Sequence, residues 1–96
     1  MLERDYQRCL VKRLQCRFPG CIILKNDAQL KQGVPDLLIL FKDKWVALEV
    51  KNSETASHRP NQDYKVQKMN EMSYAAFIYP ENEKQILKEM GEVFGA

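Results

Sequence analysis

Three charged residues stand at the ends of apolar stretches in the segment GVPDLLILFKDKWVALEVK, residues 33–51. Asp36 precedes the first apolar stretch, and Glu49 and Lys51 end the second. A charge buried without a partner is costly, because it loses its hydration and gains nothing in return. Charged side chains at such positions therefore indicate a bound partner or a catalytic role.

The two carboxyl groups would face each other if the apolar stretches form neighbouring strands. Residues two apart in a strand point to the same side, so Glu49 and Lys51 share a side. The short connection at 42–44 favours a hairpin, and a loop of two or four residues places Asp36 opposite Glu49. A three-residue loop would instead place Asp36 opposite Val50, on the wrong face.

Such a pair of carboxylates predicts a bound cation. Two carboxylates this close repel each other, and one stays protonated unless a cation lies between them. Mg²⁺ and Mn²⁺ prefer oxygen ligands from carboxylates, carbonyls and water, and Asp36, Glu49 and the backbone carbonyl of Val50 supply that set. Pro35 lacks an N–H group, which lets the chain leave regular strand pairing there. Lys51 would then lie beside the metal, where it could orient a water or stabilise charge on a phosphate.

Two more polar residues lie on helix faces that we expect to turn toward the sheet. At about 100° per residue, Glu3 lies on the same stripe as Leu10 and Leu14. Gln62 lies near the apolar face of a later helix. Both are therefore candidates for the same site, although Glu3 could simply favour a helix N-terminus and Gln62 could be a capping or solvated residue.

The pattern around these residues predicts an α/β fold. Helical spacing of apolar residues predicts three helices, and short apolar runs predict four strands. In chain order they are a helix at 2–17, strands at 21–24, 36–41 and 45–51, a helix at 60–72, a strand at 75–79 and a last helix with its apolar stripe at 86–94. This order predicts a mixed sheet flanked by helices.

Composition places the chain among ordinary globular proteins. Its 96 residues, 45% hydrophobic and 29% charged, predict a single domain over 1–96. No apolar run approaches the roughly 20 residues that span a bilayer, and the N-terminus lacks a signal-peptide pattern, so we expect a cytoplasmic protein and no membrane partner. Cys9, Cys16 and Cys21 lack zinc-site spacing, and we expect reduced, partly buried thiols.

Positive charge is concentrated in the part of the chain that holds the acids. Residues 1–68 contain 13 Lys and Arg against 8 Asp and Glu, whereas residues 69–96 contain 2 against 5. A basic surface around an acidic centre suits a nucleic acid that must meet a metal; two solvated faces of opposite charge would give the same count. The candidate nucleic-acid contacts are Arg4, Arg8, Lys12, Lys31, His58, Arg59 and Lys65, of which the helical cations could equally form a solvated face and His58 could be a bystander.

Pro35-Asp36 followed by Glu49-Val50-Lys51 matches the P-D…(D/E)-x-K pattern, which Glu3 and Gln62 extend. On these residues the chain resembles the VRR-NUC family, the virus-type replication-repair nucleases of the PD-(D/E)xK superfamily, in its minimal stand-alone phage or bacterial form. The resemblance implies a restriction-endonuclease-like αβββαβ core with an added C-terminal helix. It implies catalytic roles for Glu3, Asp36, Glu49, Lys51 and Gln62, with metal contacts from Glu3, Asp36, Glu49 and the Val50 carbonyl.

The function expected from these observations is Mg²⁺- or Mn²⁺-dependent DNA endonuclease activity. The resemblance further implies a preference for branched DNA such as Holliday junctions, a role in DNA repair in a bacterial or phage-infected cell, and a homodimer. A C₂ dimer would supply the two sites that symmetric cuts in a four-way junction need. The alternatives are a non-catalytic nucleic-acid-binding or assembly subunit on the same fold, and a nuclease that prefers flaps or strand ends.

Overall fold

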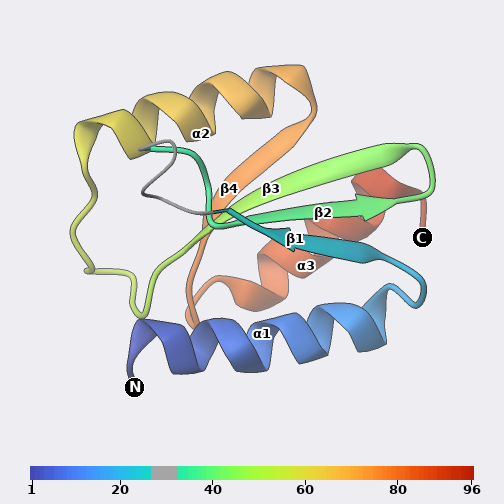
Figure 1. Cartoon of the computed structure of the whole chain (residues 1–96), viewed down its shortest axis with the longest axis horizontal. Coiled ribbons are helices and arrows are strands. Elements are labelled where there is room, and N and C mark those ends of the chain that lie inside the picture. Colours follow the sequence, from blue (N-terminus) through green and yellow to red (C-terminus); the bar gives the residue numbers. More distant parts are fainter. Residues whose placement is uncertain (27–32) are drawn as a thin grey trace.

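The computed structural model describes residues 1–26 and 33–96, and it confirms the predicted α/β class. The elements follow the predicted order, and the strand bounds lie within one residue of those expected (Figure 1). They are α1 (Glu3–Arg17), β1 (Ile22–Lys25), β2 (Leu37–Phe41), β3 (Lys44–Val50), α2 (Pro60–Met72), β4 (Tyr74–Ile78) and α3 (Glu83–Phe94). Of the sequence-based candidates, Lys31 lies outside the described residues.

The four described strands form one mixed sheet in the order β1-β2-β3-β4, in which only the β3–β4 pair is parallel. Strands β2 and β3 form a hairpin in which Phe41 pairs with Lys44, so the loop has two residues. Lys42 in that loop has a φ of 57°, as tight hairpin turns require. Leu37 pairs with Leu48, and this is the register that sets Asp36 opposite Glu49.

Helices cover both faces of the sheet, with α1 and α3 on one side and α2 on the other (Figure 1). Val46, Leu48 and Val50 of β3 belong to the larger core on the α1 and α3 side. Ala47, between them, packs on the α2 side. Because side chains alternate along a strand, Glu49 is directed to the α2 side, where the sheet and α2 meet.

A polar contact fixes α1 to α3. The Tyr6 hydroxyl donates to Glu83 Oε1 at 2.7 Å, and the Arg13 guanidinium donates to both Glu83 carboxylate oxygens at 2.6 and 2.8 Å. A bidentate pair of this kind fixes relative orientation better than a single contact does. It therefore fixes α1 relative to the start of α3.

The expectation for the cysteines was partly wrong. Cys9 and Cys16 are exposed, and only Cys21 is half-buried. The reason is that Leu10, Leu14 and Phe18 take the inward face of the first helix and its end, which leaves the other two thiols on outward faces. Among the helices in the described ranges, none is both long and apolar enough to cross a membrane.

Candidate active site

The five candidate catalytic residues line one cavity. It has a volume of about 390 Å³ and lies where the first turn of α1, the start of β2, the end of β3 and the start of α2 meet. Three residues of the connection between β3 and α2 complete its wall. The lining residues are Glu3, Asp36, Glu49, Lys51, Ala56, Ser57, Arg59 and Gln62.

Asp36 is held by backbone groups of the two neighbouring strands. Its carboxylate Oδ2 accepts the N–H of Val50 at 2.9 Å, and its own carbonyl accepts the N–H of Asn26 at 2.8 Å. Within a strand, the N–H and C=O of one residue point to the same neighbour. The Val50 carbonyl is therefore directed to the same side as its N–H, toward Asp36.

Asn26 is a residue of this site that sequence reasoning missed. Its side-chain amide donates to the Pro35 carbonyl at 2.6 Å, in addition to the backbone contact with Asp36. It extends the antiparallel register of β1 and β2, in which Lys25 pairs with Leu37. Extending the β1–β2 pairing by one residue would have identified Asn26 as the neighbour of Asp36. The sequence pattern, however, places residue 26 in a polar loop.

Gly33 brings the chain before Asp36 against the start of α2. Its φ is 84°, a conformation that side chains disfavour. A Cβ at this position would lie 2.9 Å from the backbone oxygen of Asn61. The glycine is thus required by both the backbone conformation and the close approach, and it sets the distance between Asp36 and the helix that carries Gln62.

Glu49 is buried, with an exposed fraction of 3%. Burial and then the neighbouring charge of Asp36 raise the pKa of Glu49 from 4.5 to about 8, against the opposing effect of Lys51. An ionised Glu49 is therefore unfavourable in the protein alone at neutral pH. A cation between the two carboxyl groups would remove this penalty.

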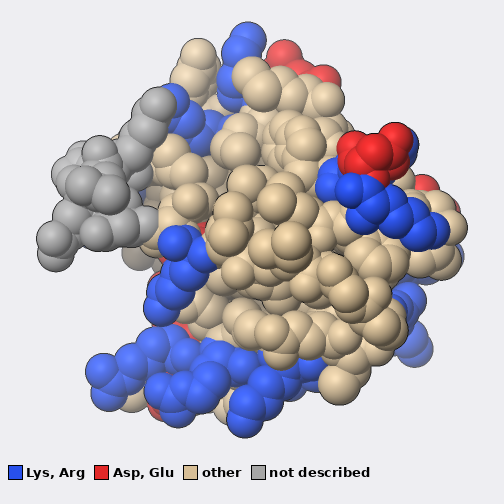
Figure 2. Space-filling model, turned by 45° about the vertical axis from the view of Figure 1, so that its right-hand side comes forward, with Lys and Arg blue, Asp and Glu red and all other residues tan. Residues whose placement is uncertain are grey.

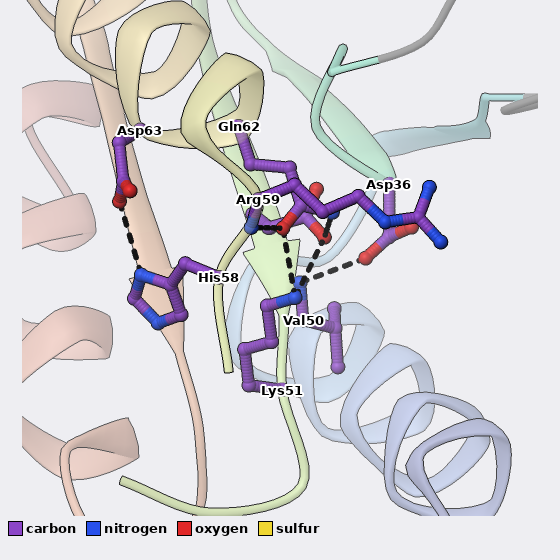
Figure 3. Close-up of polar contacts among 8 residues, drawn as sticks. Asp36, Val50, Lys51, His58, Arg59, Gln62 and Asp63 are labelled. Atoms are coloured by element: carbon purple, nitrogen blue, oxygen red, sulfur yellow. Dashed lines mark hydrogen bonds and ion pairs between the residues drawn. The ribbon is translucent and has the colours of Figure 1, made fainter. Parts of the chain in front are cut away.

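Lys51 and Gln62 form a network with Glu49. Figure 3 shows the Lys51 side chain directed toward Gln62. The Lys51 ammonium donates to Gln62 Oε1 at 2.9 Å and lies 3.8 Å from Glu49 Oε2, while Gln62 Nε2 donates to Glu49 Oε2 at 3.1 Å. The backbone N–H of Arg59 donates to the same Gln62 oxygen at 3.1 Å. Gln62 therefore orients the lysine and the acid together, and its position at the first turn of α2 fixes it in the cavity.

Glu3 lies on the same helical face as Leu10 and Leu14, as predicted, but it is exposed at the rim of the cavity. The buried residues of α1 are Tyr6, Leu10 and Leu14. Glu3 is the first residue of α1, and this end of the helix extends beyond the hydrophobic core. Partial burial and then the charge of Asp36 raise the pKa of Glu3, and Lys51 lowers it. It is therefore part of the same electrostatic site, although it is solvent-exposed.

The donor set fits a hard divalent cation that keeps several waters. Asp36, Glu49 and the Val50 carbonyl offer oxygen ligands only, which suit Mg²⁺ or Mn²⁺. Across residues 1–26 and 33–96, no group of three or more His, Cys, Asp and Glu side chains is arranged to hold a metal. The described protein groups would thus fill part of a coordination shell, and water the rest.

Comparison with solved structures identifies a similar fold. A structure described as a VRR_NUC domain protein matches with a TM-score of 0.68 over 99% of this chain and 90% of that chain, at 17% sequence identity. The fold of this chain is therefore similar to that of the VRR_NUC domain protein. No protein-family model matches the sequence, and no curated protein matches it. At this identity the likeness concerns the fold, and it agrees with the core that the sequence pattern predicted.

On this fold, the candidate nucleic-acid contacts lie in three places. Arg59 lines the cavity itself, and Arg4, Arg8 and Lys12 line a neighbouring groove on α1. The remaining described candidates, His58 and Lys65, lie outside both concave surfaces, and Lys65 is half-buried on α2.

His58 is turned away from the cavity (Figure 3). Its ring stacks on Phe77 with centroids 3.9 Å apart, and its Nδ1 lies 3.0 Å from Asp63 Oδ1. These contacts hold the segment before Arg59 against β4 and α2, which is a positioning role.

We expect Asn26→Ala to weaken the catalytic site without unfolding the protein. The variant loses the side-chain bond to the Pro35 carbonyl but keeps the backbone bond to Asp36, so Asp36 becomes less precisely placed. Loss of one such orienting contact typically costs about 10- to 100-fold in activity or metal affinity. Initial rates of DNA cleavage over a manganese titration measure this, and Asn52→Ala, an exposed asparagine, is the matched control. Equal rates for Asn26→Ala and wild type would contradict the role of Asn26.

Proposed function

We propose that this protein is a DNA endonuclease that uses Mg²⁺ or Mn²⁺ to hydrolyse phosphodiester bonds. The observation that carries the proposal is the placement of two facing carboxyl groups, Asp36 and the buried Glu49, beside the ammonium group of Lys51 in one open cavity. Two neighbouring carboxyl groups do not stabilise the fold, because the ionisation of one makes the ionisation of the other costly. A bound divalent cation would make the pair favourable.

The side chains of the cavity have separable roles in this proposal. The metal, when bound, would lower the pKa of a coordinated water and polarise the phosphate. Lys51 would donate to a non-bridging phosphate oxygen or hold the attacking water, and Gln62 keeps its ammonium group in place. Arg59, at the cavity wall, supplies a second positive charge for the phosphate. Glu3, at the rim, would contact the metal through water or directly.

The finer parts of the proposal are branched DNA as substrate and a homodimer as the active form. One chain offers one such cavity among its described residues, whereas symmetric cuts in a four-way junction need two. A second copy could cover the exposed apolar side chains of the edge strand β1, where Ile22 is 57% and Leu24 46% exposed. The predicted context remains DNA repair in the cytoplasm of a bacterial or phage-infected cell.

Synthetic four-way junctions, flaps and linear duplexes of matched sequence test this proposal. We expect cleavage with Mn²⁺ or Mg²⁺, none in EDTA, and junctions cut at least about tenfold faster than duplex, a difference of about 1.4 kcal/mol. Paired nicks at symmetric positions within single junctions, and a dimer mass in light scattering of the same sample, test the two-site form.

Each alternative has its own outcome in that experiment. DNA binding without cleavage under any metal condition would support a non-catalytic binding subunit and overturn the nuclease proposal. Faster cutting of flaps or strand ends would assign a different substrate to the same chemistry. Unpaired nicks together with a monomer mass would remove the dimer.

A further inference from the structure

A second concave surface lies beside the active-site cavity. It is a groove of about 480 Å³ between α1 and β1. Its floor is apolar, formed by Val11, Ile23 and Leu37. We call it the basic groove, because its walls carry Arg4, Arg8 and Lys12 from α1 and Lys25 from β1.

The walls of the basic groove are positively charged on both sides. Ile23 packs toward the core on the α1 side, and Lys25, two residues on, shares that direction and faces α1. Among the described residues that line the groove, none is acidic. Within residues 1–26 and 33–96, the groove cation that forms an ion pair is Arg8, which lies 3.8 Å from Asp5. Both side chains are largely exposed, and pairs of that kind contribute little.

The cations on α1 recur every fourth residue, which places Arg4, Arg8 and Lys12 along one face. At 1.5 Å per residue they extend over about 12 Å of the helix. One DNA strand in a duplex presents a phosphate about every 3.4 Å along the axis, so three or four consecutive phosphates fit this length. Figure 2 shows Lys and Arg side chains gathered along the lower edge of the molecule, where α1 lies.

The basic groove and the active-site cavity are lined by residues that are neighbours in the chain. Glu3 and Asp36 line the cavity, and the residues that directly follow them, Arg4 and Leu37, line the groove. A strand lying in the groove would therefore be directed toward the end of the sheet that carries the carboxyl groups. The sign of charge changes at this junction, from cations along the groove to acids in the cavity, as expected where phosphates are first neutralised and then meet a metal.

We propose that the basic groove binds the sugar-phosphate backbone of the strand to be cut, over three or four nucleotides on one side of the scissile phosphate. This inference rests on the proposed function and adds to it. In this proposal Lys25 contacts a phosphate, and the bound strand runs along α1 toward Lys12. The sugars of the strand pack on the apolar floor of the groove. Arg59, across the cavity, would contact the strand on the other side of the scissile phosphate.

Binding of a fluorescent duplex in EDTA, followed by anisotropy over a range of salt concentrations, tests the proposal without any cleavage. The groove variant is Arg8→Gln with Lys25→Gln, one cation from each wall, both exposed. The matched control is Lys84→Gln with Lys88→Gln, two exposed cations of α3 that do not line the groove. Thermal unfolding followed by circular dichroism checks that each variant is folded.

We expect the groove variant to bind at least about tenfold more weakly near physiological salt, with the slope of log K against log salt reduced by about 2. The control should keep the wild-type affinity and slope. Equal slopes for the groove variant and wild type, or an equal loss in the control, would overturn the proposal. Unchanged DNA binding with loss of polyglutamate binding would assign the groove to an acidic protein segment instead.

The outcome is independent of the nuclease proposal, because binding is measured without metal. If the wild type cleaves DNA and the groove variant binds normally, the groove inference fails and the nuclease stands. If no DNA is cleaved under any condition but the groove variant binds weakly, the nuclease fails and the groove remains a DNA-binding surface.

Discussion

Replacement of Asp36 by Asn, or of Glu49 by Gln, is expected to lower manganese-dependent DNA cleavage by about 10³-fold or more, roughly 4 kcal/mol in the barrier. Each change removes one negative oxygen ligand while keeping the size of the side chain. The hydrogen bonds of the site can persist, because the new amide oxygen in Asp36→Asn can still accept the Val50 N–H, and the one in Glu49→Gln can still accept from Gln62. Initial rates on the best DNA substrate measure the effect.

The matched controls for these variants are the same chemical changes at exposed acids. Asp43→Asn lies in the β2–β3 turn, where the aspartate side chain is 84% exposed, and Glu71→Gln lies on the surface of α2. Both should cleave at the wild-type rate. DNA affinity in EDTA should be unchanged or slightly increased in Asp36→Asn, because the substitution removes a negative charge near the phosphates. Cleavage within a few fold of wild type by either site variant would refute the metal site.

The Asp36–Glu49 pairing could be predicted from sequence because it depends on local rules. Two apolar stretches joined by a short turn form a hairpin, and the length of the turn then determines which residues pair. The sequence left two registers open, and the observed two-residue turn with Lys42 at positive φ decides between them. The apolar runs also specify the strands and the buried helix stripes, which is why the order of elements was correct.

Other parts of the site could not be predicted, because they depend on how distant elements pack. Asn26 contacts Pro35 only because β1 pairs with β2, and the sequence shows no reason for that pairing beyond a short apolar run. Glu3 has the spacing of an inward residue but lies past the end of the core, since the helix extends beyond the sheet. His58 is positioned by Phe77, a residue 19 places further along the chain, and no local pattern connects the two.

Metal-free protein is expected to lose stability as the pH rises from about 5 to 8. Glu49 has a pKa near 4.5 in an unfolded chain and about 8 in the folded protein, so between these values the folded state binds more protons than the unfolded state. The free energy of unfolding therefore falls with increasing pH across this window. Each pKa unit is worth about 1.4 kcal/mol, so the full shift sets an upper limit of about 5 kcal/mol.

Urea unfolding in EDTA at a series of pH values measures this loss, and Glu49→Gln is the variant that isolates it. The amide of this variant carries no proton to lose, so its stability should change much less between pH 5 and 8, and it should exceed that of the wild type at pH 8. The lowered pKa values of Glu83 and Glu89 act below this window. The raised pKa of Glu3 acts in the same direction as that of Glu49 and is present in both proteins, so the difference between the two proteins reports Glu49. An equal pH dependence in the two proteins would contradict the burial of Glu49 beside Asp36.

Manganese should reverse the loss in the wild type, and more strongly at pH 8 than at pH 5, because the cation binds the ionised carboxylate that the proton otherwise occupies. The same addition should have little effect on Glu49→Gln. This comparison separates a metal site from a pair of acids that merely share a proton, since both explain a raised pKa and only the former explains a stabilisation that grows with pH. The measurement needs no DNA, so it tests the metal site independently of the proposed nuclease activity.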